Sequence, residues 1–316
     1  MLSGLSPVSS VTITPLQVCV AAALAVILVL LIAFPTALLN SAIENAVDHR
    51  TPESKRPARH LSGWWKAVLG VALAAVISGF VDPGFGLNEM SARAFAAILI
   101  ALLIDILIGW SARIWVVRRL RPGEPVSFRF VPLTLLIVVG AVVLTRFTGF
   151  HPAIIFGLVA GMVFSSAVSV AQQAHTELIG LGYGFAVAIA AWAIYSFIPD
   201  RPGDPVALFA QETLAAAAIA GIAALPILLF PARGLPGYTV FRWRRTAWGL
   251  ASFVALFAFL LLLMPMPSSW SEIESPLVVW VGIYVPYCIA AVTVWIAVKL
   301  LNARAGAPTA ERRAPS

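Results

Sequence analysis

Long apolar runs recur from one end of this chain to the other, and they decide what it can fold into. The run "AAALAVILVLLIAF" near the N-terminus is typical, because it holds no charged residue and does not alternate apolar with polar positions. Spans of about 20 mostly apolar residues are typical of transmembrane helices, since lipid offers no hydrogen-bond partners to an open backbone. A transmembrane β-barrel would instead alternate over about 10 residues. The runs predict an all-α fold, a polytopic transmembrane helix bundle.

Composition agrees with this prediction. Only 11% of the 316 residues are charged, 60% are hydrophobic and the mean hydropathy is +0.94, whereas soluble domains carry about 25% charged residues. We count about nine spans, at residues 16–39, 65–81, 92–110, 131–147, 152–170, 178–198, 206–230, 247–264 and 277–300. The first run has no basic region before it, so we expect a retained span and not a cleaved signal peptide. The expected organisation is an external N-terminal segment (1–15), a transmembrane helical domain (16–302) and a disordered cytoplasmic tail (303–316).

Basic residues predict the orientation. Under the nine-span count, 18 of the 21 Lys and Arg residues fall on one side, in the segments after spans one, three and seven and in the tail. Cytoplasmic loops carry such an excess of basic residues, so we expect the N-terminus outside, the C-terminus in the cytoplasm and a location in the plasma membrane. The net charge of +7 belongs to this bias and does not indicate nucleic-acid binding. The expected partners are the lipid bilayer, with anionic headgroups at the cytoplasmic loops, and other membrane proteins or further copies of this chain.

Four stretches carry a family resemblance. They are "LIAFPTALLNSAIENAVDHR", "VDPGFGLNEMSARAFAAILIALLI", "LTRFTGFHPAIIFGLVAG" and "ILLFPARGLPGYTVFRWRRTAWGLASFVALFAF", in this order along the chain. In these stretches the chain resembles the bacterial FGLLP-motif-containing multi-pass membrane proteins. It departs from them at the name-giving motif, where it reads "ILLFP" at residues 227–231. The resemblance implies a helical membrane domain and no established activity.

Four polar residues inside or beside the spans are candidates for a ligand site or an ion path: Asp105, Arg146, His151 and Glu212. A carboxylate at the bilayer centre costs about 2.5–3.5 kcal/mol on insertion scales, so Asp105 is expected to face protein. Arg146 and Glu212 lie at similar depth near the outer ends of their spans, and we expect them to pair. His151 precedes a proline and is interpreted first as a helix start at the outer interface, with a ligand or proton-sensing role as the alternative.

Small residues four apart predict close helix packing. Gly157, Gly161 and Ser165 form one stripe along the fifth span, and Gly180 and Gly184 in the sixth could supply a matching groove. Such stripes let helix backbones approach closely in lipid.

Neither a catalytic constellation nor a metal or cofactor motif is recognisable, and the two cysteines lie apart inside apolar spans. The sequence therefore favours an integral plasma-membrane protein acting as a scaffold or as an accessory subunit of an envelope complex, and argues against an enzyme without excluding one. The first alternative is a transporter or channel for a small solute or ion, and the second is a membrane-embedded enzyme. A continuous polar cavity joining the four candidate residues would favour transport.

Overall fold

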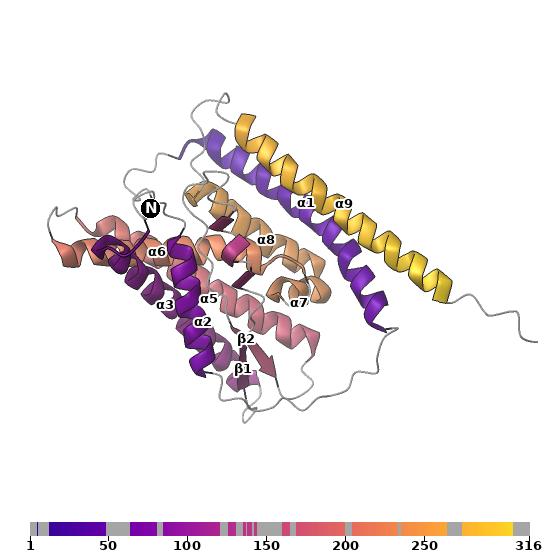
Figure 1. The fold of residues 1–316 in the computed structure, drawn as a ribbon, viewed down its shortest axis with the longest axis horizontal. Coiled ribbons are helices and arrows are strands. Elements are labelled where there is room, and N and C mark those ends of the chain that lie inside the picture. The colour runs from indigo at the N-terminus through magenta and orange to yellow at the C-terminus, as the bar shows by residue number, and fades with distance from the viewer. Residues whose placement is uncertain are drawn as a thin grey trace, which may run out of the picture.

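The computed structural model describes most of the helical segments and leaves several connecting segments undescribed. It covers residues 5, 13–48, 64–80, 85–120, 126–130, 135–136, 138–140, 142–143, 160–164, 169–199, 204–232, 235–263 and 274–305. Its helices are α1 (Pro15–Asp48), α2 (Trp64–Gly79), α3 (Glu89–Leu120), α5 (Val170–Phe197), α6 (Pro205–Leu228), α7 (Pro236–Trp243), α8 (Arg245–Ala258), its π-helical continuation η3 (Phe259–Leu263) and α9 (Glu274–Ala305). Two strands, β1 (Val126–Phe130) and β2 (Ala160–Phe164), form an antiparallel pair (Figure 1).

Five described helical segments are long and apolar enough to cross a membrane. They are Pro15–Leu38, Glu89–Arg119, Val170–Phe197, Pro205–Leu228 and Arg245–Leu263. The prediction of a multi-pass helical membrane protein is therefore confirmed. These segments match predicted spans one, three, six, seven and eight. Span two corresponds to α2, with the apolar stretch Val68–Gly79, and span nine to α9, with the apolar stretch Tyr284–Leu300. Spans four and five lie largely outside the described residues, so the count of nine and the orientation stay predictions.

Two helices are longer than the sequence analysis predicts. Helix α3 continues to Leu120 through part of the segment expected to be a loop, because no proline interrupts it before residue 122. Helix α5 begins at Val170, so the segment "AQQAHTE" is helical and not the expected turn. Ser169 caps this helix by accepting a hydrogen bond from the backbone N–H of Gln172 at 3.3 Å. A side-chain cap of this kind satisfies one of the N–H groups that a helix start leaves unpaired.

The predicted helix of span five is wrong over residues 160–164, which form β2. The strand pairs with β1 in the register Arg129↔Gly161. Both strands contain aromatic and β-branched residues, as in "VSFRF" and "AGMVF", and such residues favour extended backbone. A short apolar run does not distinguish a strand from a buried helix by periodicity alone, which explains the error.

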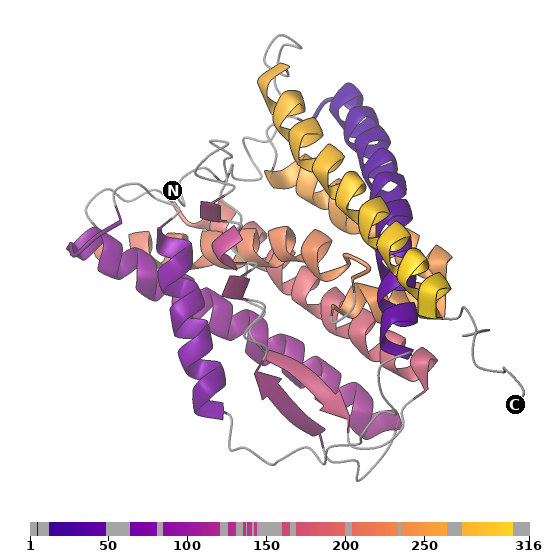
Figure 2. The same ribbon diagram turned by 45° about the vertical axis from the view of Figure 1, so that its right-hand side comes forward.

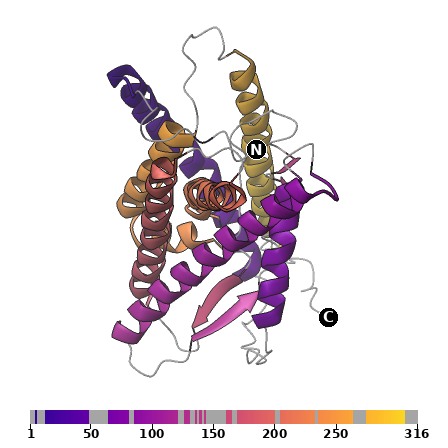
Figure 3. The same cartoon turned by 90° about the vertical axis from the view of Figure 1, so that its left-hand side faces the viewer.

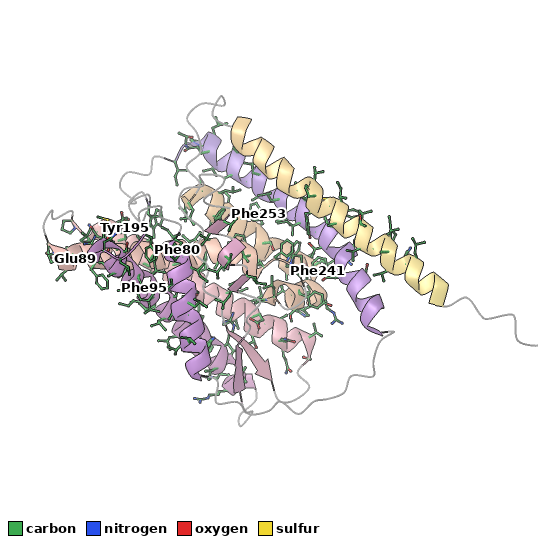
Figure 4. All side chains as sticks on the ribbon, in the orientation of Figure 1. Phe80, Glu89, Phe95, Tyr195, Phe241 and Phe253 are labelled. Atoms are coloured by element: carbon green, nitrogen blue, oxygen red, sulfur yellow. The ribbon has the colours of Figure 1, made fainter. Side chains whose placement is uncertain are left out.

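Helices α3, α5 and α6 pack on one another and form the centre of the bundle. Half of the α6 membrane window is buried inside the protein, against 17% for α1, so α6 is the central helix. Asp204 starts α6 by accepting hydrogen bonds from the N–H groups of Val206 and Ala207 at 3.0 and 3.2 Å. Gly180 of α5 lies against Arg113 of α3 and Gly184 against Asp105, so these two helices run in opposite directions. Glu89, at the start of α3, and Tyr195, near the end of α5, both appear at the left of Figure 4. In Figure 3 the long α3 runs obliquely across the bundle, with the strand pair below it.

Helices α1 and α9 lie side by side and run in the same direction (Figures 1 and 2). The Tyr284 hydroxyl donates to the carbonyl of Leu31 at 3.0 Å, and the hydroxyls of Tyr287 and Thr36 share a hydrogen bond of 2.6 Å. Thr36 is almost fully buried, and its hydroxyl also donates to Ile32 O, one turn earlier in α1. The Thr36 hydroxyl is thus hydrogen-bonded within α1 and to α9.

Two further hydrogen bonds fasten other helices to the end of α6. The indole N–H of Trp248 donates to the carbonyl of Leu229 at 2.7 Å, and the Asn40 side-chain amide donates to the carbonyl of Pro231. A helix leaves its last carbonyls without partners inside the helix, and these side chains supply partners from α8 and α1. The end of α6 is therefore a junction between the central helices and the α1–α9 pair.

Candidate functional site

Three of the charged residues of α3 face neighbouring helices: Arg93, Asp105 and Arg113. Near the start of α3, Arg93 forms a two-pronged ion pair with Glu212 of α6, with Nε–Oε2 at 2.8 Å and Nη2–Oε1 at 3.0 Å. Both side chains are partly buried, at 31% and 17% exposure. Two parallel charge-assisted hydrogen bonds fix the relative position of the two helices as well as neutralising both charges.

Near the end of α3, Arg113 pairs with Glu177 of α5, with Nε–Oε2 at 3.1 Å. Glycine makes room for this arginine. A Cβ at Gly180 of α5 would lie 2.6 Å from Arg113 Nε, and one at Gly109 would lie 3.3 Å from its Nη1. Arg113 is buried, and a buried charge that loses its partner is strongly destabilising. The two glycines therefore serve the ion pair as well as the helix contact.

Asp105 lies between the two ion pairs and lines a small cavity enclosed by α3, α5 and α6. The cavity measures about 40 Å³, enough for two or three water molecules. Arg113, Gly180, Gly184 and Gly221 also line it. Among the described residues the Asp105 carboxylate forms neither a hydrogen bond nor a salt bridge, and its Oδ1 lies 3.4 Å from where a Cβ on Gly184 would be. Its charge is attracted by Arg113, which lines the same cavity. The site can therefore hold water, a proton or a small cation.

The spacing along α3 gives these charges a depth. From Arg93 to Asp105 is 12 residues (105 − 93), or roughly 18 Å of helix, and from Asp105 to Arg113 is 8 residues (113 − 105), or roughly 12 Å. The sum, about 30 Å, equals the hydrocarbon thickness of a typical bilayer. Along the helix axis, Asp105 thus lies between the two ion pairs, which are separated by a length comparable to that thickness.

An apolar layer separates the Asp105 cavity from the Arg93–Glu212 pair. On α3 its members are Ala97, Ile98, Ala101 and Leu102, and on α6 they are Ala215, Ala216, Ala218, Ile219 and Ile222, all at most 1% exposed. These residues belong to one hydrophobic core, apart from Ala97, which is equally buried. Within the described part of the chain, Glu212 does not line the cavity that holds Asp105.

Helices α5 and α6 meet through small residues. A Cβ added to Gly221 of α6 would lie 2.5 Å from Ala188 Cβ and 3.5 Å from the carbonyl oxygen of Gly184, both on α5. Gly180 and Gly184 were predicted to supply a groove for the fifth span, most of which lies outside the described residues. Gly180 faces the Arg113 side chain, and Gly184 faces Asp105 and α6, so their partners include α3 and α6.

The remaining predicted residues fall in two groups. Gly161 lies in β2, opposite Arg129 of β1, so it does not belong to a helical stripe as predicted. Arg146, His151, Gly157 and Ser165 lie outside the described residues. In the described structure Glu212 pairs with Arg93, and its expected pairing with Arg146 lies outside the described residues.

Sequence reasoning missed three members of this site, Arg93, Arg113 and Glu177. The nine-span count places Arg113 in the basic segment after span three, on the cytoplasmic side, and Glu177 in the connection between spans five and six. The Arg93–Glu212 pair could have been found from the sequence. Arg93 is the fifth residue of α3 and Glu212 the eighth of α6, so both lie within the first few turns. The spans that contain them are predicted to start on the same side of the membrane. Matching depths from equivalent helix ends would have found this pair.

The described residues contain no group of three His, Cys, Asp or Glu side chains that could hold a metal ion. The site thus offers two ion pairs, which can fix helix positions, and the Asp105 carboxylate, which forms no salt bridge among the described residues and can bind a proton, water or a cation. The chain matches no protein-family model, and neither a curated protein nor a solved structure is similar to it. The resemblance to the FGLLP-motif proteins stays a prediction.

Proposed function

We propose that this protein is a scaffold or accessory subunit in the bacterial plasma membrane and acts by binding other membrane components. The apolar layer between Asp105 and the Arg93–Glu212 pair carries this proposal. A solute path along α3 and α6 would have to cross side chains that are at most 1% exposed, where the facing surfaces of both helices are alanine, isoleucine and leucine. The charged residues on this route are engaged as helix ties, which suits a fixed bundle.

Two measurements test the proposal. The first is flux through proteoliposomes that contain the purified full-length chain and a trapped pH-sensitive or ion-sensitive dye. A scaffold should leave the leak rates of protons, sodium and potassium equal to those of protein-free vesicles. A flux that depends on the protein and disappears in Asp105→Asn would contradict the scaffold and favour transport.

The second measurement looks for the partner directly. A photo-crosslinking residue is placed in living cells at an exposed apolar position on either side of the molecule: Leu30 of α1 or Ile289 of α9 on one side, and Leu107 of α3 on the other. These residues are 66%, 60% and 63% exposed within the chain, so each faces lipid or a partner. A scaffold should give one discrete protein adduct from one side only. Adducts with lipid alone at all three positions would refute it.

Transport of a small cation or proton is the second candidate, and the Asp105 cavity favours it. A carboxylate that lines a small cavity among membrane helices, with no salt bridge among the described residues, is the kind of residue that transporters use to bind a proton or an ion. The cavity lies on the Arg113–Glu177 side of the apolar layer, so a substrate would enter from that end. The flux assay above decides between the two candidates.

A further inference from the structure

Three arginines gather at the corner where α7 ends and α8 begins. Arg242 belongs to the last turn of α7, Arg244 connects the two helices in extended backbone (φ −150°, ψ 117°), and Arg245 starts α8. All three are exposed. We call this group the arginine corner.

Each arginine of the corner lies over an aromatic ring. The guanidinium carbons lie 5.7 Å from the ring centre of Tyr238 for Arg242, 5.2 Å from that of Trp243 for Arg244, and 5.4 Å from that of Phe241 for Arg245. Such contacts hold a planar guanidinium over the ring while its N–H groups stay available for phosphate oxygens. The corner therefore presents three positive charges whose positions are already restricted.

The backbone beneath the corner is firmly held. Gly237 of α7 packs so closely on the end of α6 that a Cβ there would overlap the Leu229 carbonyl group. That carbonyl also accepts the indole N–H of Trp248, whose ring meets Phe241 edge-on at 5.0 Å between centres. Trp243 packs against His175 of α5, with ring centres 4.5 Å apart. Four elements thus fix the corner, so binding there needs little ordering of the protein.

The corner stands at the membrane surface. The membrane-spanning segment Arg245–Leu263 begins at its last arginine. Leu250 and Val254, five and nine residues further on, are 67% and 43% exposed and face outward where lipid chains lie. In Figure 4, Phe241 lies on the other side of the molecule's centre from Glu89. An apolar face directly beneath a cluster of arginines and aromatic rings is the arrangement expected at the headgroup level.

We propose that the arginine corner binds the headgroup phosphate of an anionic phospholipid. The charge, the rings and the depth agree with this ligand, and no acidic side chain caps the start of α8. The cap residue Arg244 offers no side-chain oxygen to the first N–H groups of α8, which leaves these donors directed at the same place. This inference is independent of whether the protein is a scaffold or a transporter, since either requires lipid at this surface.

The test uses the purified full-length protein in neutral detergent and counts retained lipid by native mass spectrometry. Phosphatidylglycerol is added in one arm, phosphatidylcholine with the same acyl chains in a second, and inorganic phosphate as a competitor in a third. The corner variant is Arg244→Gln/Arg245→Gln. The matched control is Arg118→Gln/Arg119→Gln, which removes two adjacent exposed arginines at the end of α3, one of them over Trp115.

The wild type should retain phosphatidylglycerol in preference to phosphatidylcholine and should keep it when phosphate is added. A basic residue near an anionic surface favours binding by about a factor of five, so the corner variant should bind phosphatidylglycerol roughly 30-fold more weakly while the control stays close to wild type. Equal losses in the two variants would reduce the site to general surface charge and overturn the proposal. Displacement by phosphate would assign the site to a soluble anion, and equal retention of phosphatidylcholine would assign it to acyl chains; each also overturns it. The melting temperatures without lipid must match, and if the double variant melts lower, the single change Arg244→Gln, on an exposed residue between helices, replaces it.

Discussion

Replacing Gly221 by alanine should destabilise the bundle, and the second change Ala188→Gly should restore it. The new Cβ would lie 2.5 Å from Ala188 Cβ, whereas carbon atoms pack best at about 3.5–4.0 Å. The next atoms, Gly184 O at 3.5 Å and Ala188 Cα at 3.6 Å, are at ordinary contact distance. The overlap therefore involves one methyl group, and moving that methyl from α5 to α6 removes it.

The magnitude follows from two opposing effects. Overpacking a tight contact costs about 1–3 kcal/mol, and exchanging glycine for alanine inside a helix returns about 1 kcal/mol. Gly221→Ala should thus lower the free energy of unfolding by about 0–2 kcal/mol net. Ala188→Gly alone should cost about 1 kcal/mol for the lost helix preference, plus the contacts of one buried methyl. In the double variant the helix preferences cancel and the overlap is gone, so it should lie within about 1 kcal/mol of wild type.

The assay is unfolding by sodium dodecyl sulfate in mixed micelles, followed by circular dichroism, for both single variants and the double variant. Gly182→Ala is the matched control, because it lies on α5 between Gly180 and Gly184 but has no atom within 4 Å of its added Cβ. It should be neutral or slightly stabilising. If Gly221→Ala is as benign as this control, or if the effects of the two single changes simply add, α5 and α6 do not meet through these residues and the reasoning fails.

Three further outcomes are expected. Gly180→Ala should destabilise the protein by about 0–2 kcal/mol net, because its Cβ displaces the Arg113 guanidinium at a cost of about 1–3 kcal/mol while alanine returns about 1 kcal/mol of helix preference. The cost should shrink in an Arg113→Leu background, and a cost that persists there would point to a different contact. Arg93→Leu and Glu212→Leu should each lower folded yield in membranes more than the double change, since each single change strands a partly buried charge, and a simple sum of the two would contradict the pair. Ser316→Cys, with the native cysteines replaced, should stay unlabelled by a membrane-impermeant thiol reagent in intact cells; labelling would refute the predicted orientation.

The sequence predicted what depends on composition and missed what depends on which helices become neighbours. Apolar runs located the membrane-crossing helices because lipid constrains each span separately. The opposite depths expected for Asp105 and Glu212 stay predictions, since they depend on the span count and orientation. The partner of Glu212 was not readable from single spans, because Arg146 and Arg93 both lie near predicted outer ends and only the packing of α3 on α6 decides between them. Short extended segments such as β2 resemble helices in apolar content, so pairing with β1 had to be seen.

Glycines illustrate the same division. Spacing by four predicted that Gly180 and Gly184 would form a groove for the fifth span, and in the structure their added Cβ atoms would lie against Arg113 and Asp105 of α3. The spacing could not say that the neighbour is a charged side chain, since small residues accommodate a backbone and a guanidinium equally well. The identity of a helix neighbour is a property of the whole bundle and is not encoded in the spacing along one helix.

The arrangement of charges along α3 bears on whether the bundle can move. Sliding α3 by one helical turn, about 5.4 Å, would break the 2.8 Å contact of Arg93 with Glu212 and the 3.1 Å contact of Arg113 with Glu177 together. The shift would also move Asp105 out of its cavity. A shift towards the Arg93 end would place Asp105 against the apolar residues of α6. Alternating access needs two arrangements of similar free energy. The shifted arrangement would leave the four charges of the two ion pairs without their partners and would also displace the fifth charge, Asp105, from its cavity. A local opening at one end of α3 would break one ion pair and keep the other. An opening on the Arg113–Glu177 side, where the Asp105 cavity lies, leaves the Arg93–Glu212 tie intact. The described helices therefore suit a bundle held in one register, with Asp105 accessible from a single side.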